Sequence, residues 1–567
     1  MTGKRSVWKG LCALLLGGVL ASVACSAENG GGGAPILRVG LMTDTHWSEK
    51  PASFGRTEAA LAVFKREKVD LICNIGDIAD LHYPEAYRYY RRKLFPAVFP
   101  DGAPPEIFIY ANHDALTHDK HGSAVRRDTD GRFAAMRREL GIANAPNDRM
   151  VLKGYPFVIF QQFVKRETME KMLAETAKEF PEGPIFVLDH MPAARFGQAE
   201  LRRSVYSQYP RIVHIYGHIH VPLRDENSIW QGSHTEIGAG CLQNWRGSLV
   251  GTAPPSKNCF EFAIMDVFKD KLIYRRFSTE DGREFKEPWI IPLPFDPKTA
   301  PWRIELRREA TPAPEFADGA ALTLTPDRPF SALELRWPAT KRGGEDYQYQ
   351  VRIERKEADG EFHPLARQDC YSEFYLAENR RKGELTQRLS SGFFDAGRQY
   401  RISVTPVGFF GKRGAPLTAE FTAPAETRPA QLVFESRDPM KELTFVAGLT
   451  GDTPMPLKDG FYIHRGGDAR LVIPKRYWEG PVRTRFRFTV EMTTSQPNSP
   501  WTIVLRNAVP LKNANNRIRT LGGKVENQRY VIEFAKRRAD FFYDLLIREG
   551  GPGKIRFNYV KLEKLPR

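Results

Sequence analysis

Residues 70–80 read DLICNIGDIAD and set the class of fold expected for the first half of the chain. The mainly apolar run from Leu71 to Ile75 has the length of a buried strand and is shorter than a typical helix. Two carboxylates, Asp77 and Asp80, follow directly after it. A buried strand that ends in carboxylates indicates an α/β sheet with a functional site at the carboxyl ends of its strands.

The same order of elements recurs on both sides of this stretch. Further apolar runs that end in polar residues are expected to form strands, at 36–44, 105–114, 183–190 and 211–220. Between them, amphipathic stretches predict helices, at 55–69, 85–95 and 169–180. Two more strand patterns, 260–268 and 271–278, predict a closing hairpin of the same domain.

The chain of 567 residues is too long for one hydrophobic core, and about three domains are expected. Two segments rich in Pro, Ala and charge read as linkers, and alternating apolar and polar residues after each of them predict β-sandwiches. The first sandwich resembles fibronectin type III modules, and the second resembles jelly-roll, galactose-binding-like modules. The predicted division is a leader 1–24, a tether 25–35, an α/β domain 36–306, a linker 307–320, a first sandwich 321–422 and a second sandwich 430–567.

The amino terminus has the layout of a secretory signal peptide. A basic start precedes an apolar stretch from Leu11 to Val23, which is shorter than the roughly 20 residues that a membrane-spanning helix needs. Cys25 comes next and resembles the acylated first residue of bacterial lipoproteins, although Ser22 stands where such signals prefer Leu. We expect export to the bacterial periplasm or cell surface, with Cys25 as a candidate lipidation site and any membrane contact made through that lipid.

The formal net charge of +16 favours anionic partners such as phosphate esters, nucleic acid or acidic lipid. It does not choose among them, because Lys and Arg are scattered along the whole chain. No basic stripe interleaved with aromatic residues accompanies the polar motifs, so a nucleic-acid partner is not expected. A nuclease is kept as an alternative that salt-dependent binding to DNA would revive.

Five short motifs supply the chemistry, and each follows its own predicted strand. They are Asp44-Thr45-His46, Gly76-Asp77-Ile78-Ala79-Asp80, Asn112-His113-Asp114, His190 and Gly217-His218-Ile219-His220. Carboxylate, imidazole and amide oxygen form the ligand set of Mn, Fe, Zn and related divalent ions. In an extended segment alternate residues point the same way, so Asp44 and His46 are expected to share one ion. The same geometry would let His218 and His220 converge.

This series of motifs resembles the calcineurin-like metallophosphoesterase superfamily over roughly residues 36–300. The family pattern runs D-x-H, G-D-x-x-D, G-N-H-[D/E], H and G-H-x-H, and one departure is Ala111 in place of the glycine before Asn-His. Alanine there would be strained if the backbone required a positive φ. The resemblance implies a four-layer α/β sandwich, with sheets flanked by helices, that binds two divalent metal ions (Mn, Fe or Zn). It implies one metal held by Asp44, His46 and His220, a second held by Asn112, His190 and His218, and Asp77 bridging both.

The same resemblance implies hydrolysis of phosphate mono- or diesters, in which a metal-bridging hydroxide attacks phosphorus. His113 would protonate or stabilise the leaving oxygen, and Asp80 would orient that imidazole. Within this family, His46 and Asp80 argue against the purple acid phosphatase branch. That branch has the patterns D-x-G and G-D-x-x-Y, with glycine and tyrosine at these two positions. No residue separates monoesters from diesters, and we expect a diesterase or a general phosphoesterase.

A function of a different class is that of a surface lipoprotein whose two sandwiches bind glycan or another envelope component. The first domain would then be a passive scaffold. The full set of ligand residues argues against passivity, because a relict domain would be expected to lose some of them. An enzyme with accessory binding sandwiches accounts for both halves of the chain.

Other polar residues near the motifs are expected to be structural. His214 reads as a packed or hydrogen-bonded sheet residue, and His234 reads as a structural hydrogen-bonding residue. Asp114 is expected to support the site from behind. The other expected bystanders are His82, His118, His121, Arg126 and Arg127.

Overall fold

The computed structural model describes residues 33–566 except 49, 119–123, 127–128, 143, 194–199, 244–259, 342–345, 377–379, 426–429, 448–452, 465–468, 497–501, 506–508, 511–516, 520–522, 537–542 and 549–551. The expected leader and Cys25 lie outside the described residues, so export and lipidation stay predictions. Within the part of the chain that is described, no helix is both long and apolar enough to cross a bilayer.

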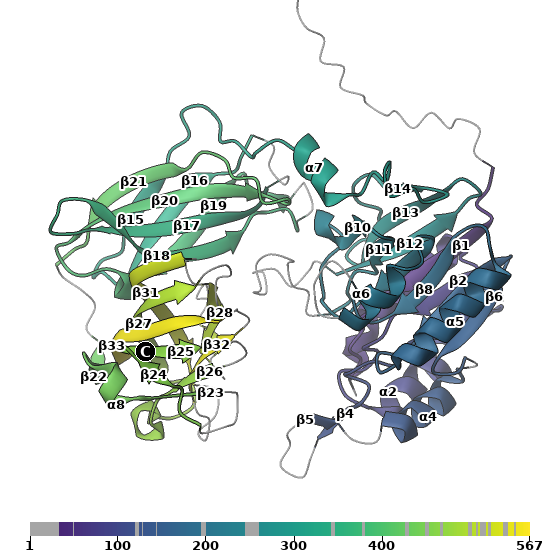
Figure 1. Cartoon of the computed structure of the whole chain (residues 1–567), viewed down its shortest axis with the longest axis horizontal. Coiled ribbons are helices and arrows are strands. Elements are labelled where there is room, and N and C mark those ends of the chain that lie inside the picture. The colour runs from purple at the N-terminus through teal and green to yellow at the C-terminus, as the bar shows by residue number, and fades with distance from the viewer. Residues whose placement is uncertain are drawn as a thin grey trace, which may run out of the picture.

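Two six-stranded sheets form the first half of the chain (Figure 1). The first has the order β14 (Trp289–Pro292), β13 (Lys271–Ser278), β12 (Glu261–Val267), β1 (Leu37–Met42), β2 (Leu71–Asn74), β3 (Glu106–Phe108). The second has the order β10 (Ile229–Gln231), β11 (Thr235–Gly238), β9 (Ile212–Tyr216), β8 (Ile185–Asp189), β7 (Tyr155–Phe160), β6 (Asp148–Leu152). Parallel pairing joins β1, β2 and β3 in one sheet, and β7, β8, β9 and β11 in the other.

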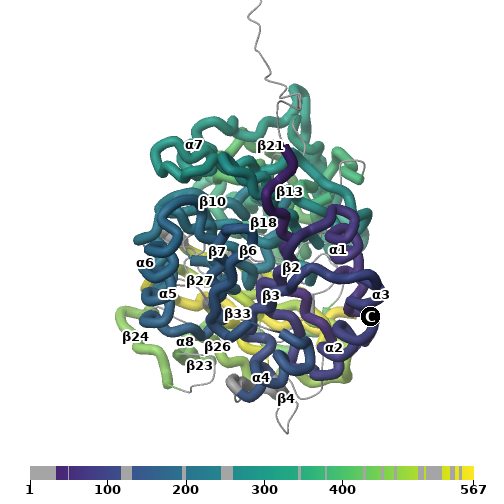
Figure 2. The backbone as a smooth tube through the Cα atoms, turned by 90° about the vertical axis from the view of Figure 1, so that its right-hand side faces the viewer, coloured from purple at the N-terminus to yellow at the C-terminus, as the bar shows by residue number. Residues whose placement is uncertain are grey.

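Helices cover the outer face of each sheet. The α-helices of this half are α1 (Gly55–Arg66), α2 (Pro84–Tyr89), α3 (Phe95–Val98), α4 (Thr129–Leu140), α5 (Arg166–Glu179) and α6 (Glu200–Tyr206). Figure 2 places α1, α2 and α3 on one side of β2, β3, β6 and β7, and α5 and α6 on the other. A small hairpin, β4 (Leu116–His118) and β5 (Ala124–Arg126), projects from the same half.

Three apolar cores hold these layers together. Leu71 and Cys73 of β2 point into a core shared by the two sheets, and Ile72 points into a second core against the helices α1, α2 and α4. A third core joins α5 and α6 to the second sheet. Because β2 is buried on both faces, its apolar run is nearly continuous, which is the pattern expected of a parallel strand covered on both sides. Helix, sheet, sheet and helix thus follow one another as the expected α/β architecture.

The sequence placed most of these elements correctly. Helix α1 lies within the predicted stretch 55–69, and helix α5 overlaps the predicted stretch 169–180 but begins three residues earlier, at Arg166. The predicted closing hairpin is confirmed, because β12 and β13 pair antiparallel with Glu261 opposite Ser278.

The stretch predicted as a linker, 307–320, begins as a helix instead. Helix α7 (Ile304–Ala310) takes up its first residues, which are the good helix formers Arg, Glu and Ala. Arg307 fixes the helix to the first half of the chain, since its guanidinium donates to the backbone oxygen of Glu226 and lies 2.8 Å from the Glu226 carboxylate. Composition alone does not predict this contact, because Glu226 lies far from Arg307 in the sequence.

The rest of the chain is rich in strands. A three-stranded sheet of β15 (Thr323–Pro326), β16 (Ala332–Pro338) and β19 (Glu384–Ser390) shares a core with a four-stranded sheet of β18 (Phe362–Tyr371), β17 (Asp346–Lys356), β20 (Gln399–Gly408) and β21 (Leu417–Thr422). Trp337, Tyr349 and Tyr400 lie in this core, on the buried side of the alternating pattern. The arrangement is consistent with an all-β domain.

A second strand-rich unit follows, with its own core. Its larger sheet contains β22 (Gln431–Ser436), β24 (Leu457–Lys458), β25 (Phe461–His464), β27 (Arg485–Gln496), β29 (Val509–Pro510), β31 (Gly523–Ala535) and β33 (Gly553–Lys564). Its smaller sheet contains β23 (Thr444–Ala447), β26 (Ala469–Val472), β28 (Thr502–Leu505), β30 (Arg517–Arg519) and β32 (Leu545–Arg548). One short helix, α8 (Pro439–Glu442), precedes β23. The exact type of each β unit, the domain boundaries and any glycan ligand stay predictions.

An aromatic cluster joins the first β unit to the α/β half. We call it the interface cluster; its buried members are Cys241, Phe260, Tyr347, Tyr371, Phe374, Tyr375 and Phe409. Beside it, the Arg224 guanidinium donates to the backbone oxygen of Tyr375 at 2.8 Å. Cys241 also touches the backbone of His220, with its thiol 3.5 Å from the His220 carbonyl oxygen. The first β unit therefore packs directly behind one of the predicted metal-ligand segments.

Candidate metal centre

The predicted site residues gather where the carboxyl ends of strands from both sheets meet. Strands β1, β2 and β3 lead to the motifs that begin at Asp44, Gly76 and Asn112, and β8 and β9 lead to His190 and Gly217. Backbone hydrogen bonds tie these strand ends together. The Asp44 N–H donates to Gly76 O at 3.0 Å, and the Gly217 N–H donates to His190 O at 3.1 Å.

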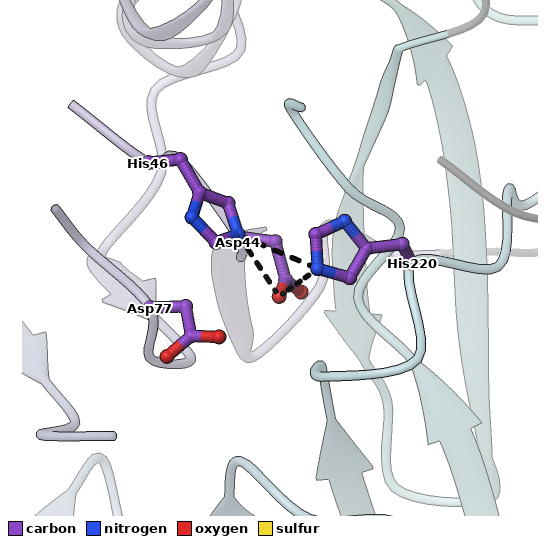
Figure 3. A group of neighbouring side chains, drawn as sticks. All are labelled: Asp44, His46, Asp77 and His220. Atoms are coloured by element: carbon purple, nitrogen blue, oxygen red, sulfur yellow. Dashed lines mark hydrogen bonds and ion pairs between the residues drawn. The ribbon is translucent and has the colours of Figure 1, made fainter. Parts of the chain in front are cut away.

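Four side chains form the first group of candidate ligands (Figure 3): Asp44, His46, Asp77 and His220. Each offers one donor atom, and these atoms all lie within 4.8 Å of one another. Asp44 Oδ1 is 3.2 Å from His220 Nε2 and 3.8 Å from His46 Nε2. All four residues are buried.

Asp77 also belongs to a second group, with His190 and His218. Its Oδ2 atom is 3.1 Å from His190 Nε2, and its Oδ1 atom accepts a hydrogen bond from the His113 backbone N–H at 2.9 Å. Asn112 precedes His113, and its own backbone N–H donates to Gln162 Oε1 at 2.7 Å. One carboxylate thus faces two separate sets of donors.

Several buried lone pairs in these groups lack a hydrogen-bond partner. They belong to Asp44 Oδ1, His218 Nδ1 and the adjacent Asn112 Oδ1. Buried acceptors without a donor cost free energy, typically about 1–3 kcal/mol each, so a ligand is expected to satisfy them. Nitrogen and oxygen lone pairs that converge around carboxylates suit divalent cations. The residues present therefore fit the metal ions that the sequence pattern implies.

Backbone carbonyl groups orient two of the imidazoles. His190 Nδ1 lies 2.6 Å from Ile75 O and His220 Nδ1 lies 2.7 Å from Gln243 O, so each ring donates through Nδ1 and turns Nε2 toward the carboxylates. Burial by itself would lower the pKa of His190, but the charge of Asp77 raises it to about 9. A proton and a cation therefore compete for the space between His190 and Asp77.

The backbone at the candidate ligands is left-handed, which the sequence did not predict. The residues concerned are Asp44 (φ 51°), His46 (φ 42°), Asp77 (φ 48°), His218 (φ 70°) and His220 (φ 54°). The expectation that D-x-H and H-x-H are extended segments is therefore wrong. Asp44 and His46 still converge, because both turn out of the strand direction after β1. Non-glycine residues in this region are uncommon, although Asp and His tolerate it better than most, and such strain tends to collect at functional sites.

Two glycines allow the strand ends to approach this closely. A Cβ atom at Gly76, whose φ is +97°, would lie 2.5 Å from His190 Nδ1. A Cβ atom at Gly217 would lie 2.0 Å from Thr43 Oγ1 and 2.8 Å from Asp44 Oδ2. The glycines in the G-D-x-x-D and G-H-x-H motifs are thus required by space around the ligands.

His113 and Asp80 lie together at the more open side of the centre. His113 Nδ1 is 2.8 Å from the backbone oxygen of Asp80 and 3.4 Å from its carboxylate. Burial alone would lower the pKa of His113, but the hydrogen bond to Asp80 and the charge of Asp77 raise it to about 9. The His113 side chain is 32% exposed, so it is accessible from solvent while its Nδ1 is held.

Asp114 supports the site from behind, as expected. Its carboxylate accepts hydrogen bonds from the backbone N–H groups of Ala111 and Ala79, both at 3.0 Å, and so ties the loop after β3 to the loop after β2. Burial raises the pKa of Asp114 to about 7. Ala111 is fully buried and does not occur among the residues with positive φ, so alanine at this position is not strained.

The remaining polar residues near the motifs either lie away from the metal centre or lie outside the described residues. His214 is a fully buried residue of β9, and His82 contacts Tyr87 at the edge of the α2 core. His121 and Arg127 lie outside the described residues, as do the side chains of His118 and Arg126.

Two residues that support the site are not predicted from the sequence. Thr43 Oγ1 donates to Asp44 Oδ2 at 2.9 Å, and Gln162 holds the backbone of Asn112. Gln162 follows β7, so the rule that polar residues collect after strands would have found it. Nothing in the sequence marks Thr43.

Replacing Gly217 by alanine is expected to weaken metal binding while leaving the fold intact. The added methyl group must displace Thr43 or Asp44, and disturbing groups that orient metal ligands typically costs about 10–100-fold in affinity. The matched control is Gly55→Ala at the start of α1, where a Cβ atom meets nothing within 4 Å. Titration of chelator-treated protein with Mn²⁺ by calorimetry measures the difference. Equal affinities in the two variants would contradict this role of Gly217.

Comparison with known proteins agrees with the geometry. Residues 37–222 match the family described as calcineurin-like phosphoesterases. Similar solved structures include a dimetal phosphatase from Danio rerio, with 13% identity, coverage of 46% of this chain and 99% of the other, and a TM-score of 0.30. A purple acid phosphatase from yellow lupin (Lupinus luteus) seeds has 15% identity, coverage of 45% and 53%, and a TM-score of 0.31. No curated protein matches the sequence significantly. Residues 37–222 are therefore similar to calcineurin-like phosphoesterases, and the buried Asp and His cluster in this range supports a metal-dependent phosphoesterase.

Proposed function

We propose that the chain hydrolyses phosphate esters with the help of two divalent metal ions that share Asp77. The observation that carries this proposal is the membership of Asp77 in both donor groups. Asp44, His46 and His220 complete one set, and Asn112, His190 and His218 complete the other. The mixture of nitrogen and oxygen donors suits Mn, Fe or Zn.

Metal ions in these positions would withdraw charge from a phosphoryl group and make a water molecule acidic enough to act as nucleophile. The protein contributes rigid positions for the ligands. Thr43 and the His218 N–H hold one Asp44 oxygen, with the His218 N–H at 3.0 Å, and leave Oδ1 without a donor. The backbone carbonyls behind His190 and His220 fix the tautomers of those rings.

His113 is the proposed proton donor to the leaving oxygen. Asp80 occupies its Nδ1, so Nε2 is the nitrogen available to a substrate. Burial lowers the pKa of His113 and the hydrogen bond to Asp80 raises it, so Asp80 favours the protonated ring that a general acid requires. Asp80 acts through His113 and is a positioning residue.

Phosphate diesters, or phosphate esters in general, are the proposed substrate class. The phosphoesterase family of residues 37–222 supports a phosphate ester, and the two β units are proposed as accessory regions. The competing function, a binding protein on a passive phosphoesterase scaffold, predicts a chain that is inert toward such esters.

Asp77→Asn is expected to reduce hydrolysis of bis(p-nitrophenyl) phosphate and p-nitrophenyl phosphate by more than about 10–100-fold, because removing even a supporting group around a metal costs about 10–100-fold. The assay compares Mn²⁺, Fe²⁺ and Zn²⁺ after removal of metal by a chelator. The exposed Asp101→Asn serves as the matched control and should keep wild-type rates. Equal inactivity of wild type and Asp77→Asn toward every ester and metal would favour the binding protein.

His113→Gln is expected to slow alkyl phosphate diesters far more than p-nitrophenyl diesters. An alkoxide needs a proton to leave, and a general acid is worth about 10²–10⁴-fold, whereas p-nitrophenolate leaves without one. The measurement is kcat for both ester classes in His113→Gln, in Asp80→Asn and in the control His82→Gln. An equal loss for both classes would rule out proton donation by His113.

A further inference from the structure

A second cluster of metal-ligating side chains lies in the core beneath the second sheet. His214 in β9, Glu236 in β11 and His234 in the turn before β11 offer three donor atoms within 4.8 Å of one another. The pairing of β9 with β11 places His214 directly opposite Glu236. All three side chains are fully buried.

The cluster is separate from the centre around Asp77. Val213 and Ile215, the neighbours of His214 in β9, point into the core between the two sheets. His214 therefore points to the opposite face, where Ile212 packs with α5 and α6. The ligands around Asp77 lie beyond the strand ends instead.

Three imidazole nitrogens in this cluster lack a well-aligned hydrogen bond. His234 Nε2 is buried without one, and neither nitrogen of His214 makes a well-aligned hydrogen bond, although the backbone of Asp189 lies beside the His214 ring. His214 Nδ1 is 4.0 Å from Glu236 Oε1, which is too far for a hydrogen bond. An unsatisfied buried lone pair costs free energy, so one lone pair from each of the two rings, facing the same carboxylate, calls for a ligand.

The surroundings prepare these nitrogens for a cation. Ser233 Oγ lies 3.1 Å from His234 Nδ1, and if it accepts a proton there, His234 presents the lone pair of Nε2 to the cluster. Burial lowers the pKa of both His214 and His234 to about 3, so both rings are neutral at physiological pH. Glu236 Oε1 accepts a hydrogen bond from the Ala193 N–H at 2.8 Å, which holds the carboxylate in place beside His214.

The other charged group nearby is already engaged. Arg202 of α6 forms an ion pair with Asp189, and Tyr206 donates to the same carboxylate at 2.8 Å. The Tyr206 ring lies over the cluster, with its centroid 5.0 Å from that of His214 and 5.9 Å from that of His234. The Tyr206 ring therefore packs against both histidines, and the Arg202 guanidinium is paired with the Asp189 carboxylate.

We propose that His214, His234 and Glu236 bind a divalent cation of the Zn²⁺ class, which ties β9, β11 and the turn at 232–234 together. Two imidazoles and one carboxylate form a ligand set typical of Zn²⁺, and a water molecule would complete tetrahedral coordination. The site is structural, since all three ligand side chains are buried. It does not depend on the function proposed for the Asp77 centre.

The test measures zinc bound per full-length chain by inductively coupled plasma mass spectrometry, together with the increase in Tm caused by Zn²⁺. Glu236→Gln keeps an oxygen for the Ala193 N–H, and His234→Phe keeps a ring beside Tyr206, so both variants should fold. Each is expected to bind one zinc fewer than wild type and to lose part of the Tm increase. Ester hydrolysis should be retained.

His363 is an exposed histidine of the first β unit. The variant His363→Phe is therefore the matched control and should bind as much zinc as wild type. Co²⁺ substitution gives an independent readout, because tetrahedral coordination produces a visible absorption band that both variants should weaken. Wild-type zinc content and wild-type Tm increase in Glu236→Gln and His234→Phe would overturn the proposal. Loss of zinc in Asp77→Asn but not in these variants would have the same consequence.

Discussion

The position of Asp77 is the constraint on which the site depends. Its carboxylate is buried, and the two oxygens face different neighbours, the His113 N–H on one side and His190 on the other. A carboxylate so far from water requires positive charge, and the imidazoles and the predicted cations supply it. The ends of five strands from two sheets are brought together around this one group.

Bringing the strand ends together has a cost that the rest of the domain offsets. Five candidate ligands have left-handed backbone, and Gly76 and Gly217 leave no room for a side chain. Cores on both faces of each sheet hold the strands in place, so the loops that follow them cannot relax. The interface cluster adds support from the first β unit, through Cys241 behind His220.

Much of this was predictable because the signals are local. The apolar run before Asp77 predicted β2, and the order of the short polar motifs predicted which residues gather at the centre. The left-handed backbone at Asp44 and His220 was not predictable, because the residue types also fit an extended segment. Contacts between distant segments were equally hidden, as Arg307 with Glu226 and His214 with His234 and Glu236 show. Each needs the sheet order before the partners can be recognised.

Anomalous X-ray diffraction from crystals soaked in Mn²⁺ tests the account most directly. Two anomalous peaks are expected, one on each side of the Asp77 carboxylate, with Asp44, His46 and His220 around the first peak. His190 and His218 should lie around the second. A well-ordered domain with no peak at Asp77, or with a single peak that Asp77 does not contact, would contradict it.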